Sequence, residues 1–211
     1  LIRKAMGLSD IEIAGTGAAI TPASLKEWYQ ELGIHLVEAY GMTEVCGSIC
    51  NGPQLDAPSD SVGTAVPYCE VKIDSDSQEI LMKAPYQMKG YYKNPEKTGE
   101  VLKDGWIHSG DRGTIDQNGY VRVIGRVKDA FKTSKGQFIV PNPIEEQLAA
   151  NEYIEQVCVV GLGCSQPLAL VNLSPGASTL KREQLEETLR ASVVKANQSL
   201  ARYQQISTLV V

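Results

Sequence analysis

Residues 40–44 read Tyr40-Gly41-Met42-Thr43-Glu44 and place an aromatic ring, a glycine, a hydroxyl group and a carboxylate in one short segment. Such groups can stack on a nucleotide base, let a phosphate approach closely and bind a metal ion. Two further segments follow in order, Ser109-Gly110-Asp111 and Gly125-Arg126, and supply a carboxylate for ribose hydroxyl groups and a cation for phosphate. One such motif is weak evidence, but three complementary motifs in order predict a nucleotide-binding site.

The residues before this segment predict a strand, a helix and a second strand. Apolar and polar residues alternate over residues 10–14, which is typical of a strand, and a glycine-containing loop follows at residues 15–19. A helix is expected next, capped by Thr21 with Pro22 in its first position, where a missing N–H costs nothing. Residues 36–40 form the second strand, which leads into the 40–44 segment.

The helix is expected to bury one face and to end at Gly33, because glycine readily adopts the left-handed conformation that closes a helix. The apolar residues of this face recur at helical spacing: Leu25, Trp28, Tyr29 and Leu32.

Short strands and tight turns characterise the chain from about residue 61 to residue 125. Residues 69–73 and 79–82 are expected to form two strands on either side of a polar turn. Asn118-Gly119 predicts a hairpin between residues 114–116 and 120–124, since this dipeptide favours tight turns. This pattern predicts a small antiparallel β-barrel.

The chain after Arg126 is expected to form a second, smaller α+β unit. It begins with a hairpin around Lys135-Gly136 and continues with a helix that Asn142 caps and Pro143 starts. A later helix has one apolar face, made of Leu185, Leu189, Val193, Ala196 and Leu200. The expected strands of this unit cover residues 153–161, 168–173 and 206–211. The fold class is therefore mixed α/β of the α+β type.

Composition excludes several classes of protein. The chain has 211 residues, a net charge of −5 and 43 % hydrophobic residues, which is ordinary for a globular protein and argues against a nucleic-acid partner. No apolar run approaches the roughly 20 residues that span a bilayer. The five scattered cysteines indicate reduced, buried thiols in a cytoplasmic protein rather than disulfides or a zinc site: Cys46, Cys50, Cys69, Cys158 and Cys164.

The order of these segments resembles the adenylate-forming (AMP-binding) superfamily, which includes acyl-CoA synthetases, luciferases and the adenylation domains of peptide synthetases. The resemblance covers essentially the whole chain. Residues 132–141 read KTSKGQFIVP and look most similar to the long-chain fatty acid/acyl-CoA synthetase branch. The resemblance implies an AMP-forming acid–thiol ligase. Such an enzyme activates a carboxylic acid with ATP and Mg²⁺ as acyl-AMP and then transfers the acyl group to coenzyme A.

The resemblance implies a role for each motif. Tyr40 would lie against adenine, while Asp111 would accept hydrogen bonds from both ribose hydroxyl groups. Thr43 would donate to the α-phosphate, Glu44 would bind Mg²⁺, and Arg126 would reach ribose and phosphate oxygens, so these three carry the catalytic assignment. The backbone around the nucleotide would come from Gly15, Thr16, Gly17, Ala18, Gly41 and Met42.

Other residues are assigned to domain motion or to structure. Lys128 falls at the hinge on which the small domain of this superfamily turns between two catalytic poses. Gly136 would line the entrance for the thiol in the second pose. His108 and the Gly90-Tyr91 pair are interpreted as structural. The expected domains are residues 1–125, the last part of the large AMP-binding domain, and residues 126–211, most of the small mobile domain.

Two segments of the superfamily pattern do not occur in the sequence: a Ser/Thr/Gly-rich phosphate loop ending in lysine, and a C-terminal PxTxxxKxxR segment. The chain is therefore expected to be a fragment that does not catalyse adenylation alone. Two alternatives stay open: an adenylating enzyme that loads a carrier protein or another acceptor, and a non-catalytic nucleotide-binding module. Acyl chain length, oligomeric state and peripheral contact with a membrane are left open.

Overall fold

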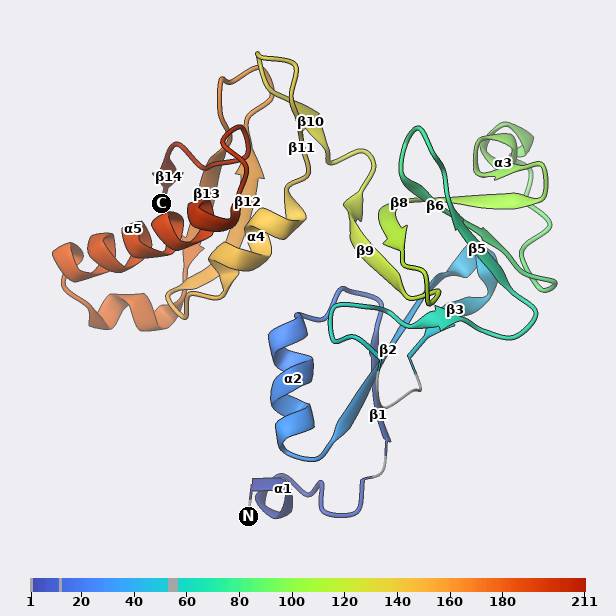
Figure 1. Cartoon of the computed structure of the whole chain (residues 1–211), viewed down its shortest axis with the longest axis horizontal. Coiled ribbons are helices and arrows are strands. Elements are labelled where there is room, and N and C mark those ends of the chain that lie inside the picture. Colours follow the sequence, from blue (N-terminus) through green and yellow to red (C-terminus); the bar gives the residue numbers. More distant parts are fainter. Residues whose placement is uncertain (1, 12, 53–56) are drawn as a thin grey trace. The chain divides into compact units, whose positions relative to one another are not determined.

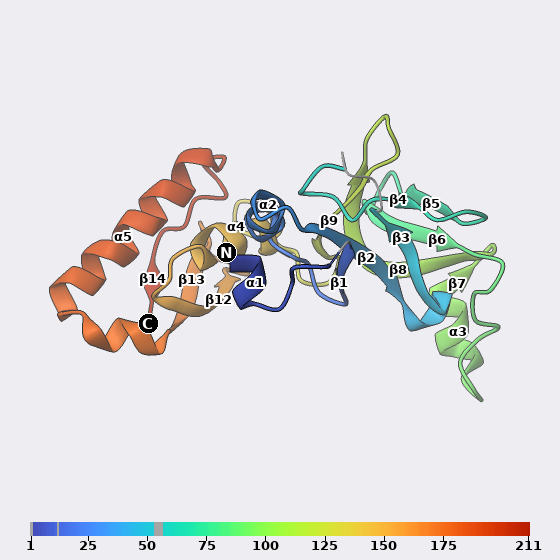
Figure 2. The ribbon, with the colours of Figure 1, turned by 90° about the horizontal axis from the view of Figure 1, so that it is seen from below.

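The computed structural model describes residues 2–11, 13–52 and 57–211, and the chain divides into two compact units, Leu1–Val123 and Ile124–Val211. Figures 1 and 2 show their elements, and each unit is described by itself. Strand β9 (Val121–Arg126) runs through the boundary between the units. The mixed α+β class expected from the sequence is confirmed.

The first unit opens with a four-stranded sheet in the order β1-β2-β3-β4. Strands β1 and β2 are parallel, and the remaining pairs are antiparallel. The elements of this part are α1 (Ile2–Ala5), β1 (Ile13–Gly17), α2 (Ala23–Glu31), β2 (His35–Met42), the 3₁₀ turn η1 (Thr43–Val45), β3 (Gly47–Asn51) and β4 (Thr64–Ala65).

The first strand lies three residues later than expected. Of the expected residues 10–14, only Ile13 and Ala14 are in the strand, and residue 12 lies outside the described residues. The expected glycine loop instead continues the strand, because residues 15–17 pair in parallel with residues 37–39 of β2. The chain turns at Ala18, which has a φ of 69°.

Helix α2 differs from its expected form in its cap and in its buried face. Pro22, not Thr21, occupies the N-cap: the Thr21 hydroxyl lies 3.0 Å from the Thr16 hydroxyl, and the Thr21 N–H donates to the Glu38 carboxylate at 2.9 Å. The face expected to be buried is largely exposed, with Leu25 and Trp28 each 42 % accessible. Lys26 is the buried residue of the helix, and it is drawn inward by an ion pair of 2.7 Å with Glu38. The helix ends at Glu31, and Gly33, two residues later, has the expected left-handed conformation with a φ of 71°.

A second sheet completes the first unit, with strand order β5-β6-β8-β7 and β9 also pairing with β8. The elements are β5 (Glu70–Ile73), β6 (Glu79–Lys83), α3 (Pro95–Val101), β7 (Leu102–Lys103) and β8 (Trp106–Ile115). The hairpin expected at Asn118-Gly119 is confirmed, with Gly119 at a φ of 83°. The core includes Val45, Ile49, Ile80, Met82 and Ile107, all fully buried.

The second unit has an antiparallel hairpin, a three-stranded sheet and two helices, as Figure 1 shows. The elements are β10 (Phe131–Lys132), β11 (Phe138–Ile139), α4 (Asn142–Ala149), β12 (Ile154–Val160), β13 (Leu168–Leu173), the 3₁₀ turn η2 (Pro175–Thr179), α5 (Arg182–Ser199) and β14 (Leu209–Val210). Asn142 lies inside α4 instead of capping it, since Pro141 holds the N-cap position. The apolar face expected for the last helix is confirmed, because its residues pack in the core of this unit.

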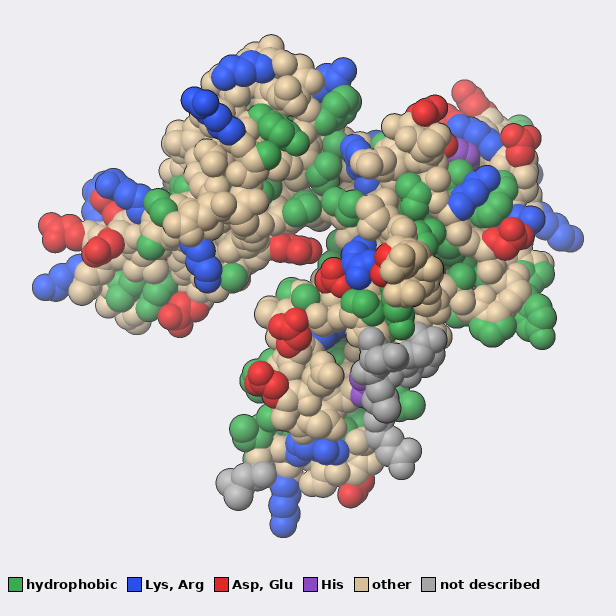
Figure 3. Space-filling model, viewed as in Figure 1, with side chains coloured by type: hydrophobic (Ala, Val, Ile, Leu, Met, Phe, Trp, Pro, Cys, Tyr) green, Lys and Arg blue, Asp and Glu red, His purple; other side chains and the backbone are tan. Residues whose placement is uncertain are grey.

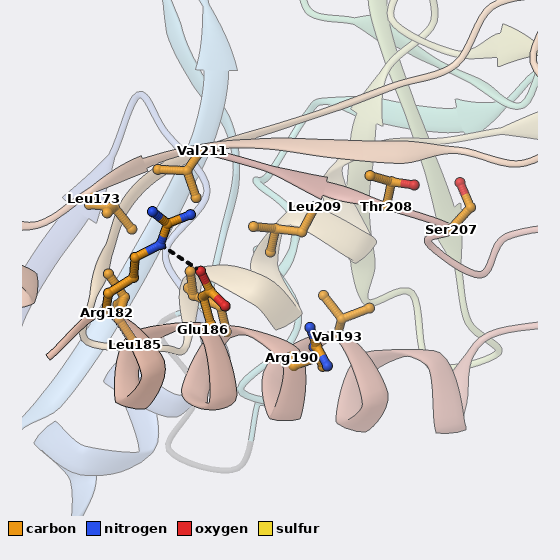
Figure 4. A pocket seen from close by; sticks show the side chains of 11 residues that line it. Leu173, Arg182, Leu185, Glu186, Arg190, Val193, Ser207, Thr208, Leu209 and Val211 are labelled. Carbon is orange, nitrogen blue, oxygen red and sulfur yellow. Dashed lines mark hydrogen bonds and ion pairs between the residues drawn. The ribbon is translucent and has the colours of Figure 1, made fainter. Parts of the chain in front are cut away.

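A groove of about 680 Å³ lies between α5 and the end of β14. Figure 4 shows that its walls are mainly apolar, with the Arg182–Glu186 ion pair at one end and Ser207 and Thr208 at the other. Its lining contains no residue of the nucleotide motifs.

Acidic and basic side chains are interspersed on the face seen in Figure 3. The thiols are all unpaired, but only Cys50 is buried, so the expectation of buried thiols is wrong for Cys46, Cys158 and Cys164, which are exposed. No helix among the described residues is long and apolar enough to cross a bilayer.

Candidate nucleotide-binding site

The first unit brings together the first two sequence motifs. The Tyr40 hydroxyl donates a hydrogen bond of 2.8 Å to Oδ2 of Asp111, although 71 residues separate them. Tyr40 stands near the end of β2 and Asp111 lies on β8. Burial, reinforced by the negative charge of Asp111, raises the pKa of Tyr40 well above its ordinary value. Tyr40 therefore keeps its proton at neutral pH and remains a donor to Asp111.

Asp111 lies in an irregularity of the ladder between β6 and β8. Glu79 pairs with Arg112 and Leu81 pairs with His108, so residues 109–111 stand opposite Ile80 alone. Gly110, in the middle of this β-bulge, has a φ of 74°, which glycine adopts without strain. Bulges re-aim side chains and occur often beside active sites.

Glu44 is held by a segment to which the sequence assigned no chemistry. Its Oε1 accepts a hydrogen bond of 2.5 Å from the Tyr91 hydroxyl, and its carbonyl oxygen accepts one of 2.8 Å from the Met88 N–H. The hydrogen bond between the Tyr91 hydroxyl and the Glu44 carboxylate is the main reason that the pKa of Tyr91 rises to about 12. Tyr91 belongs to the Gly90-Tyr91 pair, which was interpreted as structural only. The tyrosine was visible in the sequence, but spacing alone does not reveal a contact across 47 residues.

The Tyr91 contact leads to a stability prediction. We expect Tyr91→Phe to lower the free energy of unfolding by about 0.5–1.5 kcal/mol, because one hydrogen bond to a partly exposed carboxylate is lost. Urea denaturation measures the change. Tyr92→Phe is the matched control, since the Tyr92 ring is 88 % exposed and its replacement is expected to leave stability unchanged. Equal free energies of unfolding for the two variants would show that the hydrogen bond with Glu44 does not stabilise the fold.

The remaining predicted residues of the first unit line the same ends of β1 and β2. Gly17 pairs with Ala39, next to Tyr40. The glycine segment of β1 and the Tyr40 motif of β2 therefore lie side by side at the carboxyl ends of these parallel strands. A Cβ on Gly17 would lie 2.9 Å from the Ala39 carbonyl oxygen. The other residues lie as follows: Gly15 and Thr16 in β1, Ala18 just after it, Gly41 and Met42 at the end of β2, and Thr43 exposed at the start of η1.

Three predicted residues belong to the second unit. Arg126 ends β9 and is exposed, and Lys128 is exposed in the turn that follows. Gly136 lies at the tip of the β10–β11 hairpin with a φ of 76° and open space where a Cβ would stand. The positions of Arg126, Lys128 and Gly136 are therefore described relative to the second unit alone.

A metal site formed by protein side chains alone is not found among the described residues, since no cluster of three His, Cys, Asp or Glu side chains occurs there. Mg²⁺ is commonly bound by one or two carboxylates together with substrate phosphates. The single carboxylate of Glu44 fits that mode of binding, in which phosphate oxygens complete the coordination.

Comparison with protein families identifies both parts of the chain. Residues 3–92 match the model of the AMP-binding enzymes, and residues 128–211 match the model of the AMP-binding enzyme C-terminal domain. These two matches cover most of each structural unit.

Curated relatives extend this similarity to named proteins. A long-chain-fatty-acid–CoA ligase of Salmonella typhimurium is 33 % identical over 159 residues, which are 71 % of this chain and 28 % of the relative. The long-chain-fatty-acid–CoA ligase FadD15 of Mycobacterium bovis is 31 % identical over 192 residues, which are 91 % of this chain and 32 % of the relative. The chain thus spans about a third of the length of these relatives.

Solved structures share the fold. o-Succinylbenzoate CoA synthetase of Bacillus subtilis, in complex with its acyl-adenylate intermediate, has a TM-score of 0.77 and 25 % identity over 96 % of this chain and 43 % of that chain. An anthranilate CoA ligase in complex with anthranoyl-AMP has a TM-score of 0.79 at 21 % identity, covering 96 % of this chain and 41 % of that chain.

Proposed function

Because the chain belongs to the superfamily of adenylate-forming, AMP-binding enzymes, we propose that its first unit binds the adenosine monophosphate part of ATP and of an acyl-adenylate. The hydrogen bond between Tyr40 and Asp111 is the observation that carries this proposal. It joins an aromatic ring suited to adenine and a carboxylate suited to ribose in one place. Asp111 would accept hydrogen bonds from the ribose hydroxyl groups, each strengthened by its negative charge.

We further propose that the chain is part of an ATP-dependent acid–CoA ligase. In this reaction an acid carboxylate attacks the α-phosphate of ATP, pyrophosphate leaves, and a thiol then displaces AMP from the acyl-adenylate. Bound Mg²⁺ would neutralise phosphate charge. Glu44, oriented by Tyr91, would hold the metal, while Thr43 would donate its hydroxyl to the α-phosphate.

The second unit is proposed to serve both chemical steps. Arg126 would reach ribose and phosphate oxygens, which its forked guanidinium suits. Lys128 would be the hinge residue, and Gly136 would leave room for the pantetheine arm of coenzyme A, since it carries no side chain. The roles of Lys128 and Gly136 are supported by the match of residues 128–211 with the C-terminal domain of the AMP-binding enzymes, and that of Arg126 by the Gly125-Arg126 motif just before it.

The proposed acid substrate is a long-chain fatty acid, and the proposed acceptor of the acyl group is coenzyme A. The names of the curated relatives, long-chain-fatty-acid–CoA ligases at 31–34 % identity, support this choice. The five unpaired thiols support a location in the reducing cytoplasm.

Replacing Asp111 tests the nucleotide assignment. We expect Asp111→Ala to weaken AMP binding by the chain at least tenfold, since one or two charge-assisted hydrogen bonds to ribose are lost. Isothermal titration calorimetry measures the affinity. Asp76→Ala removes an exposed carboxylate of the same unit and serves as the control, with affinity expected to stay within about twofold of the wild type. Unchanged affinity of Asp111→Ala would remove Asp111 from the site.

A further inference from the structure

We infer that Glu79 is a positioning residue for Asp111: its carboxylate holds the β-bulge of residues 109–111 in the shape that aims Asp111 at the ribose. This inference rests on the proposed function and deepens it. Neither the nucleotide motifs nor the sequence pattern assigns any role to Glu79.

The bulge leaves backbone groups that a regular ladder would have paired. Residues 109–111 stand opposite one residue of β6, so two of them have no counterpart on that strand. Backbone N–H groups in a folded protein need partners, and in this bulge side chains provide them. The Asp111 N–H donates to Ser109 Oγ at 3.0 Å, and the Gly110 N–H donates to Glu79 Oε1 at 2.7 Å.

Glu79 is itself fixed at both carboxylate oxygens. Its Oε2 lies 2.8 Å from His108 Nδ1, while Oε1 accepts from Gly110, so the carboxylate bridges the residues on either side of buried Ser109. The Glu79 side chain is only 15 % exposed, and the hydrogen bonds to a charged acceptor are therefore little screened by solvent. His108, expected to be structural, contributes here by holding Glu79.

The geometry links Glu79 to ligand binding through one residue. Gly110 directly precedes Asp111, and its φ of 74° sets the direction in which the next residue leaves the strand. If the bond to Glu79 is lost, the bulge can relax and Asp111 no longer meets both Tyr40 and ribose. Glu79 is not expected to contact the nucleotide itself, so its effect on binding is limited to the contacts that Asp111 makes.

The test compares two ligands that differ only in the ribose hydroxyl groups. Calorimetry gives the affinities of the chain for AMP and for 2′,3′-dideoxy-AMP, and the wild type is expected to prefer AMP by about tenfold or more. Glu79→Ala is expected to reduce that preference to about twofold while leaving the affinity for dideoxy-AMP unchanged. Glu79→Gln is expected to keep most of the preference, because its amide oxygen can still accept from the Gly110 N–H.

Glu70→Ala is the matched control, since Glu70 is a glutamate of the neighbouring strand whose side chain forms an exposed ion pair with Lys83. It is expected to retain the full preference for AMP. A wild-type preference that survives in Glu79→Ala would overturn the role of Glu79 and leave the nucleotide site intact. Absence of any preference in the wild type would instead overturn the ribose assignment of Asp111.

Amide hydrogen exchange of Gly110 gives a readout that needs no ligand. In the wild type and in Glu79→Gln the Gly110 N–H is expected to exchange slowly, and in Glu79→Ala at least tenfold faster, while the amides of Ile107 and Val121 in the core keep their protection. Loss of protection throughout the first unit in Glu79→Ala would mean a general stabilising role and would contradict positioning. Slow exchange of Gly110 in Glu79→Ala would contradict it as well.

Discussion

Replacing Lys26 by methionine is expected to lower the free energy of unfolding by about 3–5 kcal/mol. Lys26 and Glu38 form a buried ion pair, with side chains that are 9 % and 4 % exposed. Lys26 also donates to the Ser61 carbonyl oxygen at 3.0 Å. Methionine keeps the apolar stem but leaves a buried carboxylate with no cation, and desolvation of that charge is the cause of the loss.

Chemical denaturation of Lys26→Met measures this loss. The control is Lys97→Met, because Lys97 forms an ion pair of the same 2.7 Å length with Glu100 on the exposed surface of α3, and its loss is expected to cost less than about 1 kcal/mol. The double variant Lys26→Met/Glu38→Gln is expected to recover part of the stability, since it removes the uncompensated charge. A loss in Lys26→Met no greater than in Lys97→Met would show that solvent reaches the Glu38 carboxylate.

Gly41→Ala is expected to lower the free energy of unfolding by roughly 3 kcal/mol and to weaken nucleotide binding at the same time. A Cβ on Gly41 would lie 1.8 Å from the carbonyl oxygen of Gly47 on the paired strand β3, so the backbone must move. Gly41 directly follows Tyr40 in β2, where the β2–β3 register shifts. A displaced backbone there would pull Tyr40 away from Asp111.

Gly15→Ala is the control for this prediction. Gly15 also lies in a strand of the same sheet, but a Cβ there would meet no atom within 4 Å, and its φ lies outside the left-handed region. Gly15→Ala is expected to change stability by less than about 1 kcal/mol. Thermal denaturation of both variants is the measurement. A lower melting temperature for Gly41→Ala alone would show a steric requirement at Gly41. Equal melting temperatures would instead show a general cost of removing glycines from strands.

Two strands of this fold were predictable with nearly correct bounds, because their pattern depends on neighbouring residues, whereas β1 was expected three residues too early. Residues 168–173 form β13 with the expected bounds, and the strand expected at residues 36–40 exists and extends to Met42. The buried face of α2 was not predictable. Periodicity placed Leu25 and Trp28 inside, but the ion pair between Lys26 and Glu38 turns a charged residue inward, and such a pair depends on which strand lies beneath the helix.

The candidate site divides in the same way. The ordered motifs predicted that Tyr40 and Asp111 belong together, and the structure joins them by a hydrogen bond. Tyr91 and Glu79 were missed because their partners, Glu44 and Gly110, lie 47 and 31 residues away and meet them only through strand register and a bulge. A single sequence, taken by itself, contains no signal for such contacts, since a glutamate at the start of a strand is usually solvated.

The binding of AMP to the first unit is the central claim, and amide chemical shifts of the ¹⁵N-labelled chain during titration with AMP test it most directly. We predict that the amides of Tyr40, Gly41, Gly110 and Asp111 shift together along one saturation curve. Shifts confined to the groove between α5 and β14, or no shifts at millimolar AMP, would contradict it.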